Sequence, residues 1–93
     1  MTTLEFAYFI CDKHEEPCYG GVEFAKNNPD LLEAIDKLLK GFGNIQFIRW
    51  ACWQEKIMGW ADFNKMASEI NSDYEENRKC AEILRKFIKD NNL

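Results

Sequence analysis

The chain has 93 residues, a formal net charge of −4, 46% hydrophobic residues and 14% aromatic residues. This length and apolar content suit a single domain, residues 1–93, with its own hydrophobic core, and they argue against a disordered segment. Lysines and arginines are dispersed along an acidic chain, which argues against nucleic acid as the primary partner, because backbone binding needs a concentrated basic face.

The start of the chain carries no basic segment followed by a long apolar run, as a signal peptide would. The apolar run at residues 6–11 is much shorter than the roughly 20 residues that a membrane span needs. We therefore expect a cytoplasmic protein without a membrane partner, in which the cysteines are free thiols.

Two strands paired as a hairpin are predicted at the start. Leu4–Cys11 is rich in aromatic and β-prone residues, which is typical of a strand. Tyr19–Ala25 is predicted to be a second strand, weakened by its two glycines. The polar residues 12–17 would form the turn.

A helix is predicted next. Residues 27–30, Asn-Asn-Pro-Asp, supply an asparagine N-cap, a proline at the first helical position and an acidic first turn. The residues that follow at helical spacing are Leu31, Leu32, Ile35, Leu38 and Leu39. Gly41 is expected to end this helix as a C-cap glycine.

Residues 45–58 allow two interpretations. Ile45–Trp53 is aromatic and branched, which favours a strand, whereas the whole of 45–58 could also wrap as a helix. We predict the strand, followed by a turn at 54–56 and a short strand near 57–61.

Two helices are predicted in the remainder. A short one follows from the helical spacing of Phe63, Met66, Ala67 and Ile70. The sequence Ser-Asp-Tyr-Glu at 72–75 is a capping box, which opens a final helix to about residue 90. The core-facing residues predicted for this helix are Tyr74, Ala81, Leu84, Phe87 and Ile88.

Together these elements predict an α+β fold: a two-layer sandwich with an antiparallel sheet of about four strands and two main helices on one face. The likeness of Phe6–Cys11 to Phe47–Cys52, and of 28–42 to 71–87, raises an internal duplication of a ββα unit. Both faces of the predicted strands are apolar, so one layer of helices would leave one sheet face exposed. Such a face marks a partner surface or a homodimer seam.

Residues 11–18 contain a weak candidate metal site. Cys11, His14 and Cys18 have the ligand types that zinc prefers, but a tetrahedral site needs four ligands and only three are local. Paired C-x-x-C motifs are absent. A plain polar loop is the favoured interpretation, with a Cys11–Cys18 disulfide as a third one.

The sequence does not predict an enzyme or a cofactor. A dyad of Cys18 and His14 would lie beside Glu15 and Glu16, which disfavour the thiolate that such a dyad needs. No glycine-rich phosphate loop is present.

The favoured function is a non-catalytic protein-binding module, an inhibitor or regulator of the size and charge typical of phage or toxin and defence-system proteins. Aromatic residues beside basic ones can stack the bases of a single strand, but the acidic balance favours a core and a protein interface. The candidate contacts are Tyr8, Arg49, Trp50, Trp53 and Trp60. The alternatives are a small-molecule or nucleotide-binding sensor and a zinc-stabilised domain that uses Cys11, His14 and Cys18.

Overall fold

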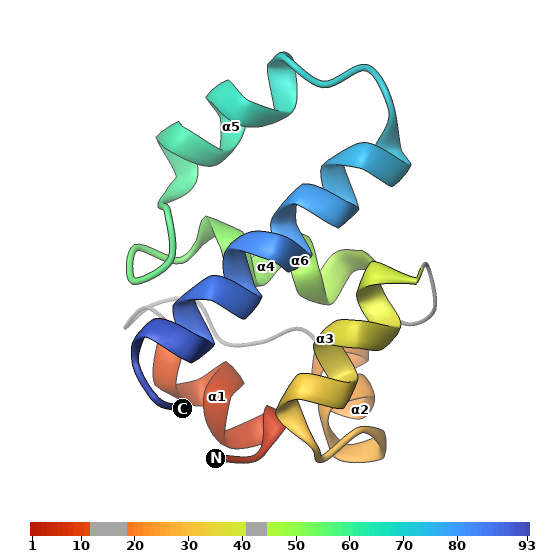
Figure 1. The fold of residues 1–93 in the computed structure, drawn as a ribbon, viewed down its shortest axis with the longest axis vertical. Helices are drawn as coiled ribbons and strands as arrows, with labels where there is room; N and C mark the ends of the chain where they lie inside the picture. Colours follow the sequence, from red (N-terminus) through yellow and green to blue (C-terminus); the bar gives the residue numbers. More distant parts are fainter. Residues whose placement is uncertain (12–18, 41–44) are drawn as a thin grey trace.

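The computed structural model describes residues 1–11, 19–40 and 45–93, and within these it shows six helices and no strand. They are α1 (Thr3–Ile10), α2 (Tyr19–Asn27), α3 (Leu31–Leu39), α4 (Ile45–Trp53), α5 (Trp60–Ser68) and α6 (Asp73–Asp90). The long helix α6 packs against both α3 and α4, while α1 and α2 lie together at the opposite end from α5 (Figure 1).

The predicted α+β sandwich is therefore wrong. The three longer predicted strands are the helices α1, α2 and α4, and the short one near 57–61 is divided between a turn and the start of α5. Because these segments are helices, the predicted duplication of a ββα unit is wrong as well. Residues 12–17, the predicted hairpin turn, lie outside the described residues.

Helix α1 shows why the strand prediction failed at the N-terminus. The Thr2 hydroxyl accepts a hydrogen bond from the Glu5 N–H (3.1 Å), and Glu5 Oε1 accepts one from the Thr2 N–H (2.9 Å). This capping box lowers the pKa of the Glu5 carboxyl, chiefly through the bond from the Thr2 backbone. The buried residues recur at helical spacing: Thr3, Phe6, Ala7 and Ile10.

Helix α4 buries one face in the same manner. Phe47, Ile48, Ala51 and Cys52 are at most 1% exposed, a pattern of i, i+1, i+4 and i+5 that only a helix places on one side. The Phe47 ring lies 5.4 Å from that of Phe24 on α2. Packing between helices thus overrides the strand preference of these aromatic residues.

The helices predicted around 31–39 and 73–90 are confirmed. The cap of α3 is Asp30, whose side chain accepts from the Glu33 N–H (2.9 Å), and not an asparagine. Gly41 lies outside the described residues. Ser72 caps α6 by accepting from the Glu75 N–H (3.4 Å).

The seam between α3 and α6 forms the centre of the core. On α6, Leu84 is completely buried and Phe87 partly buried, whereas Tyr74 is 61% exposed, so its predicted core position is wrong. The apolar residues of α3 that pack into this core are Leu31, Ala34, Ile35 and Leu38. Arg85 and Asp36 pair across the seam (3.2 Å).

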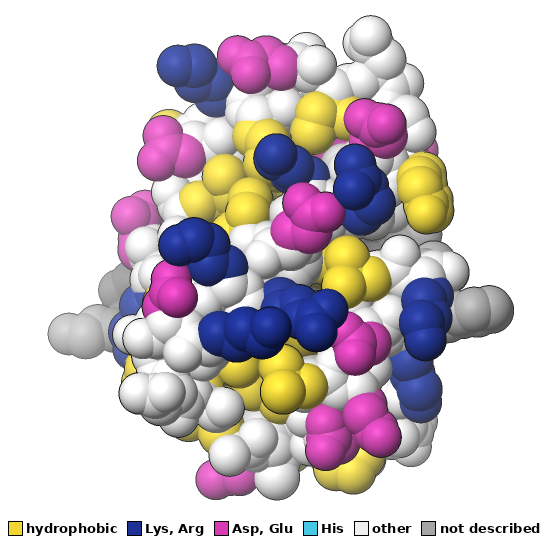
Figure 2. All heavy atoms as spheres, viewed as in Figure 1, with side chains coloured by type: hydrophobic (Ala, Val, Ile, Leu, Met, Phe, Trp, Pro, Cys, Tyr) yellow, Lys and Arg dark blue, Asp and Glu magenta, His cyan; other side chains and the backbone are white. Residues whose placement is uncertain are grey.

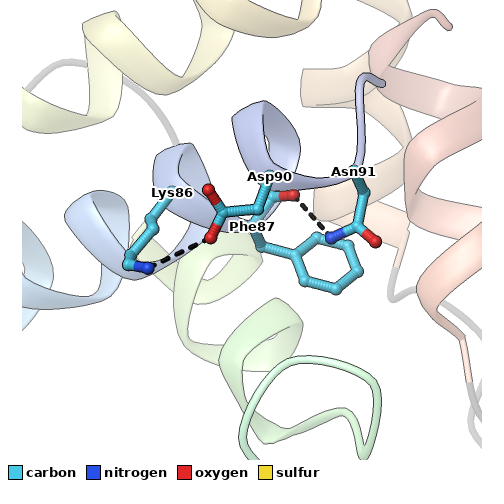
Figure 3. Close-up of polar contacts among 4 residues, drawn as sticks. All are labelled: Lys86, Phe87, Asp90 and Asn91. Atoms are coloured by element: carbon cyan, nitrogen blue, oxygen red, sulfur yellow. Dashed lines mark hydrogen bonds and ion pairs between the residues drawn. The ribbon is translucent and has the colours of Figure 1, made fainter.

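The C-terminal end of α6 is closed by its own side chains (Figure 3). Asn91 Nδ2 donates to the Phe87 carbonyl (2.8 Å), and Lys86 Nζ pairs with Asp90 (3.1 Å). The Leu93 N–H also donates to the Ile88 carbonyl (3.0 Å). The bond from Leu93 gives a partner to a carbonyl in the last turn, where helix carbonyls lack the usual partners.

No helix in the described ranges combines the length and the apolar character required to cross a membrane.

Candidate docking surface

Three aromatic residues meet where α4 ends and α5 begins, and we call them the aromatic shelf: Trp53, Trp60 and Phe63. The rings of Trp53 and Trp60 are 4.6 Å apart in an edge-to-face arrangement, and Phe63 lies 5.7 Å from Trp53 and 6.3 Å from Trp60. Phe63 is buried and Trp53 partly buried, but Trp60 is 53% exposed. The shelf therefore holds one large exposed ring on a packed aromatic base.

A turn at residues 54–59 positions this shelf. The Gln54 carbonyl accepts hydrogen bonds from the N–H groups of Ile57 (3.0 Å), Met58 (3.1 Å) and Gly59 (3.1 Å). The Gln54 side chain is fully buried, and its Nε2 donates to the Trp50 carbonyl (2.9 Å). The turn is thus fixed to the last turn of α4, which brings Trp60 over Trp53.

Gly59 allows the chain to enter α5. Its φ of 83° and ψ of 158° lie in a region that is essentially restricted to glycine. A Cβ at this position would also lie 3.2 Å from a carboxylate oxygen of Glu55. The backbone conformation, more than the contact, requires glycine here.

We expect Gly59→Ala to lower the free energy of unfolding by about 1–3 kcal/mol. The reason is that alanine is strained at the φ and ψ angles that Gly59 adopts. Chemical denaturation measures this loss, and the tryptophan fluorescence should shift to the red as the shelf loosens. Asn64→Ala, exposed on α5, is the matched control and should keep wild-type stability. A Gly59→Ala variant as stable as the wild type would contradict this account of the turn.

Apolar side chains border the shelf. Ile57, Met58, Met66 and Ala67 are only partly buried against the core, and Phe63 is the one residue of α5 that is deeply buried. Figure 2 shows hydrophobic side chains reaching the surface in the upper part of the molecule, where Figure 1 places α5. The main packing contact of α5 is with α4. Much of the apolar surface of α5 therefore stays open.

The C-terminal end of α1 touches the same turn. Lys56 Nζ donates to the Phe9 carbonyl (2.8 Å) and lies 4.2 Å from the centre of the Phe9 ring. Phe9 is 40% exposed, and its sequence neighbour Tyr8 is 56% exposed. This contact ties α1 to the turn that carries Trp60.

Charged and sulfur groups lie between α4 and α6. Arg49 on α4 pairs with Glu76 on α6 (3.2 Å); the side chain of Arg49 is 42% exposed and that of Glu76 only 8%. Cys52 and Cys80 are fully buried, and the Cys52 thiol donates to the Cys80 carbonyl (3.6 Å). Arg49 thus neutralises a carboxylate that packing has removed from water.

The structure brings together two of the five candidate contacts, Trp53 and Trp60. Trp50 is 8% exposed and packs against Phe47 in the core. Arg49 is engaged by Glu76, and Tyr8 projects from α1. A role for these last three in partner binding stays a prediction.

The candidate zinc ligands are only partly described. Cys11 is half-buried, while His14 and Cys18 lie outside the described residues. Within residues 1–11, 19–40 and 45–93, no group of three or more metal-ligating side chains comes together.

Sequence reasoning missed two parts of the site. Phe63 was assigned only a helical period, although with Trp60 and Ala67 it forms an i, i+3, i+7 stripe that indicates one continuous apolar face. The turn was placed at 54–56, with a strand after it. Gly59 immediately before the aromatic stripe was the available signal, since glycine is accepted at helix N-caps.

Comparisons of the chain with protein-family models, curated proteins and solved structures find no match, so the geometry of the shelf alone carries the functional interpretation.

Proposed function

We propose that the chain is a non-catalytic protein-binding module, an inhibitor or regulator of its partner, that docks through the aromatic shelf. The part of the chain that the structure describes forms no sheet, so the shelf replaces the sheet face that the sequence predicts as the docking surface. One observation carries the idea: Trp60 is 53% exposed although its ring is packed at 4.6 Å against Trp53. A tryptophan held in place before binding loses little conformational freedom when it binds, which makes it an effective anchor.

The charge of the segment that carries the shelf indicates the chemistry of the partner. Residues 55–76 carry six acidic and two basic side chains, whereas the rest of the chain carries ten of each. The whole net charge of −4 therefore belongs to the segment that contains α5, although Glu76 is neutralised by Arg49. Complementary charge speeds association and fixes orientation. We infer a cytoplasmic protein partner. This partner offers Trp60 an apolar pocket that is flanked by lysines or arginines.

Replacing Trp60 with alanine should weaken binding at least 30-fold, about 2 kcal/mol, which is the loss that defines an interface anchor. The partner is first recovered by affinity capture from host lysate on the wild-type protein and on the variants side by side. Its affinity for each purified variant is then measured by calorimetry. Leu32→Ala removes a 43% exposed side chain from α3 and should leave the affinity within about twofold.

Circular dichroism must show that the Trp60→Ala variant stays helical. A partner that binds this variant as tightly as the wild type would overturn the proposal, as would a lysate in which no captured protein depends on Trp60. Light scattering gives a further outcome: if the wild type is a dimer and Trp60→Ala a monomer, the shelf is a homodimer seam and the docking proposal is wrong. The described residues offer no observation that favours a small-molecule sensor instead.

A further inference from the structure

The two buried cysteines of the helical core come from different helices. Cys52 lies on α4 and Cys80 on α6, and these helices pack against each other. Both side chains are 0% exposed. The Cys52 thiol lies 3.6 Å from the Cys80 carbonyl oxygen. The two cysteines therefore meet across the buried interface between α4 and α6.

The pair is chemically asymmetric. The neighbouring Cys52 side chain lowers the pKa of the Cys80 thiol, and the nearby Arg49 guanidinium acts in the same direction, against burial and Glu76. The Cys80 side chain, together with burial, raises the pKa of Cys52. Cys80 thus has the greater thiolate character, which makes it the more nucleophilic sulfur. Cys52 is the less acidic thiol of the two.

We propose that Cys52 and Cys80 are a redox modification site, at which a peroxide converts the two thiols into a disulfide that links α4 to α6. Hydrogen peroxide is small enough to enter a packed core through a brief local opening. The Cys80 thiolate attacks one peroxide oxygen and expels hydroxide, which leaves Cys80 as a sulfenic acid. Cys52 then loses its proton to that hydroxide, forming water, and its sulfur attacks the Cys80 sulfur.

The second attack forms the S–S bond and expels the sulfenic oxygen as hydroxide, which becomes water by taking up the proton that Cys80 had given to the solvent. Overall, two thiols and one hydrogen peroxide give one disulfide and two waters, and the two electrons pass from sulfur to oxygen. Residues 53–79, which include the turn and α5, then lie inside a covalently closed loop. The base of the docking surface is fixed in this state independently of the noncovalent core.

Trypsin separates the four cysteines into four peptides, which makes the test direct. Cys52 falls in residues 50–56 and Cys80 in 80–85, while Cys11 and Cys18 fall in 1–13 and 14–26. The folded, reduced protein is treated with hydrogen peroxide, quenched with an alkylating reagent under denaturing conditions, and digested. We expect peptides 50–56 and 80–85 joined by a disulfide, with a mass loss of two hydrogens, and a higher thermal midpoint in the oxidised protein.

Variants assign the roles. Cys52→Ala should leave Cys80 as a sulfenic acid that dimedone traps, whereas Cys80→Ala should leave Cys52 alkylatable. Cys11→Ala should not change the joined pair, and it keeps the test valid where a core variant folds poorly. The proposal is overturned if Cys52 and Cys80 both remain alkylatable while Cys11 oxidises, or if the joined peptides form only in urea-unfolded protein.

Discussion

Replacing Phe47 with alanine is expected to lower the free energy of unfolding by about 3–5 kcal/mol. Phe47 is completely buried on α4, and its ring lies 5.4 Å from Phe24 and 6.1 Å from Trp50. Its truncation removes apolar contact area and leaves a cavity that rigid neighbouring rings cannot fill. Because a domain of this size is stable by only about 5–15 kcal/mol, the loss is large. Urea denaturation followed by circular dichroism measures it.

Leu32→Ala is the matched control, since this leucine lies on α3 with 43% of its surface exposed. Its cost should be within about 0.5–1 kcal/mol. If Phe47→Ala proves too unstable to measure, Phe47→Leu should still show a loss of about 1 kcal/mol, with the same helical spectrum. A loss of less than that in both variants would mean that Phe47 does not pack into the core against α2.

The second large effect concerns the ion pair between α4 and α6. Arg49→Met should cost about 2–3 kcal/mol, because it leaves the Glu76 carboxylate, whose side chain is only 8% exposed, without a cation. Arg78→Met is the control: Arg78 and Glu82 pair at a similar distance, but both are about half exposed (49% and 48%). An exposed pair of this kind contributes less than about 1 kcal/mol.

The double variant Arg49→Met/Glu76→Leu completes the measurement. Removing both charges should restore most of the stability, since apolar replacements of a buried pair are often neutral. A double-mutant cycle on the free energies of unfolding then gives the coupling between the two side chains. Equal small losses for Arg49→Met and Arg78→Met would show that solvent screens Glu76 well enough without its partner.

The sequence was most informative where one amphipathic pattern and a cap agreed. Around α3, the leucine and isoleucine spacing and the capping residues at 27–30 left one interpretation, although the cap is Asp30 and not the predicted asparagine. For α6 the serine cap and the acidic first turn agreed with the apolar spacing. For α1 the composition of Leu4–Cys11 favoured a strand, although Thr2 and Glu5 already formed a capping-box pattern. In α1 the exposed residues are Glu5, Tyr8 and Phe9, and because the last two are adjacent they do not alternate as in a half-buried strand.

The sequence likewise predicts some features of the candidate site and not others. Trp53 and Trp60 could be nominated from composition, because tryptophans near charged residues are frequent interface anchors. Their contact could not, since it depends on one carbonyl of Gln54 receiving three N–H groups and on the positive φ of Gly59. Gly59 indicates where α5 begins, but residue spacing does not indicate the three hydrogen bonds to one carbonyl that shape the turn before it.

The central position of α6 has a consequence for how the chain is made. The apolar stripes of α3 and α4 are covered by α6, which the ribosome synthesises after both of them. During translation these stripes therefore stay uncovered until residues 73–90 have emerged, and nascent chains in this condition are prone to association. Chaperone demand should be highest in this interval, and the order of the helices along the gene, more than their strength, sets its length.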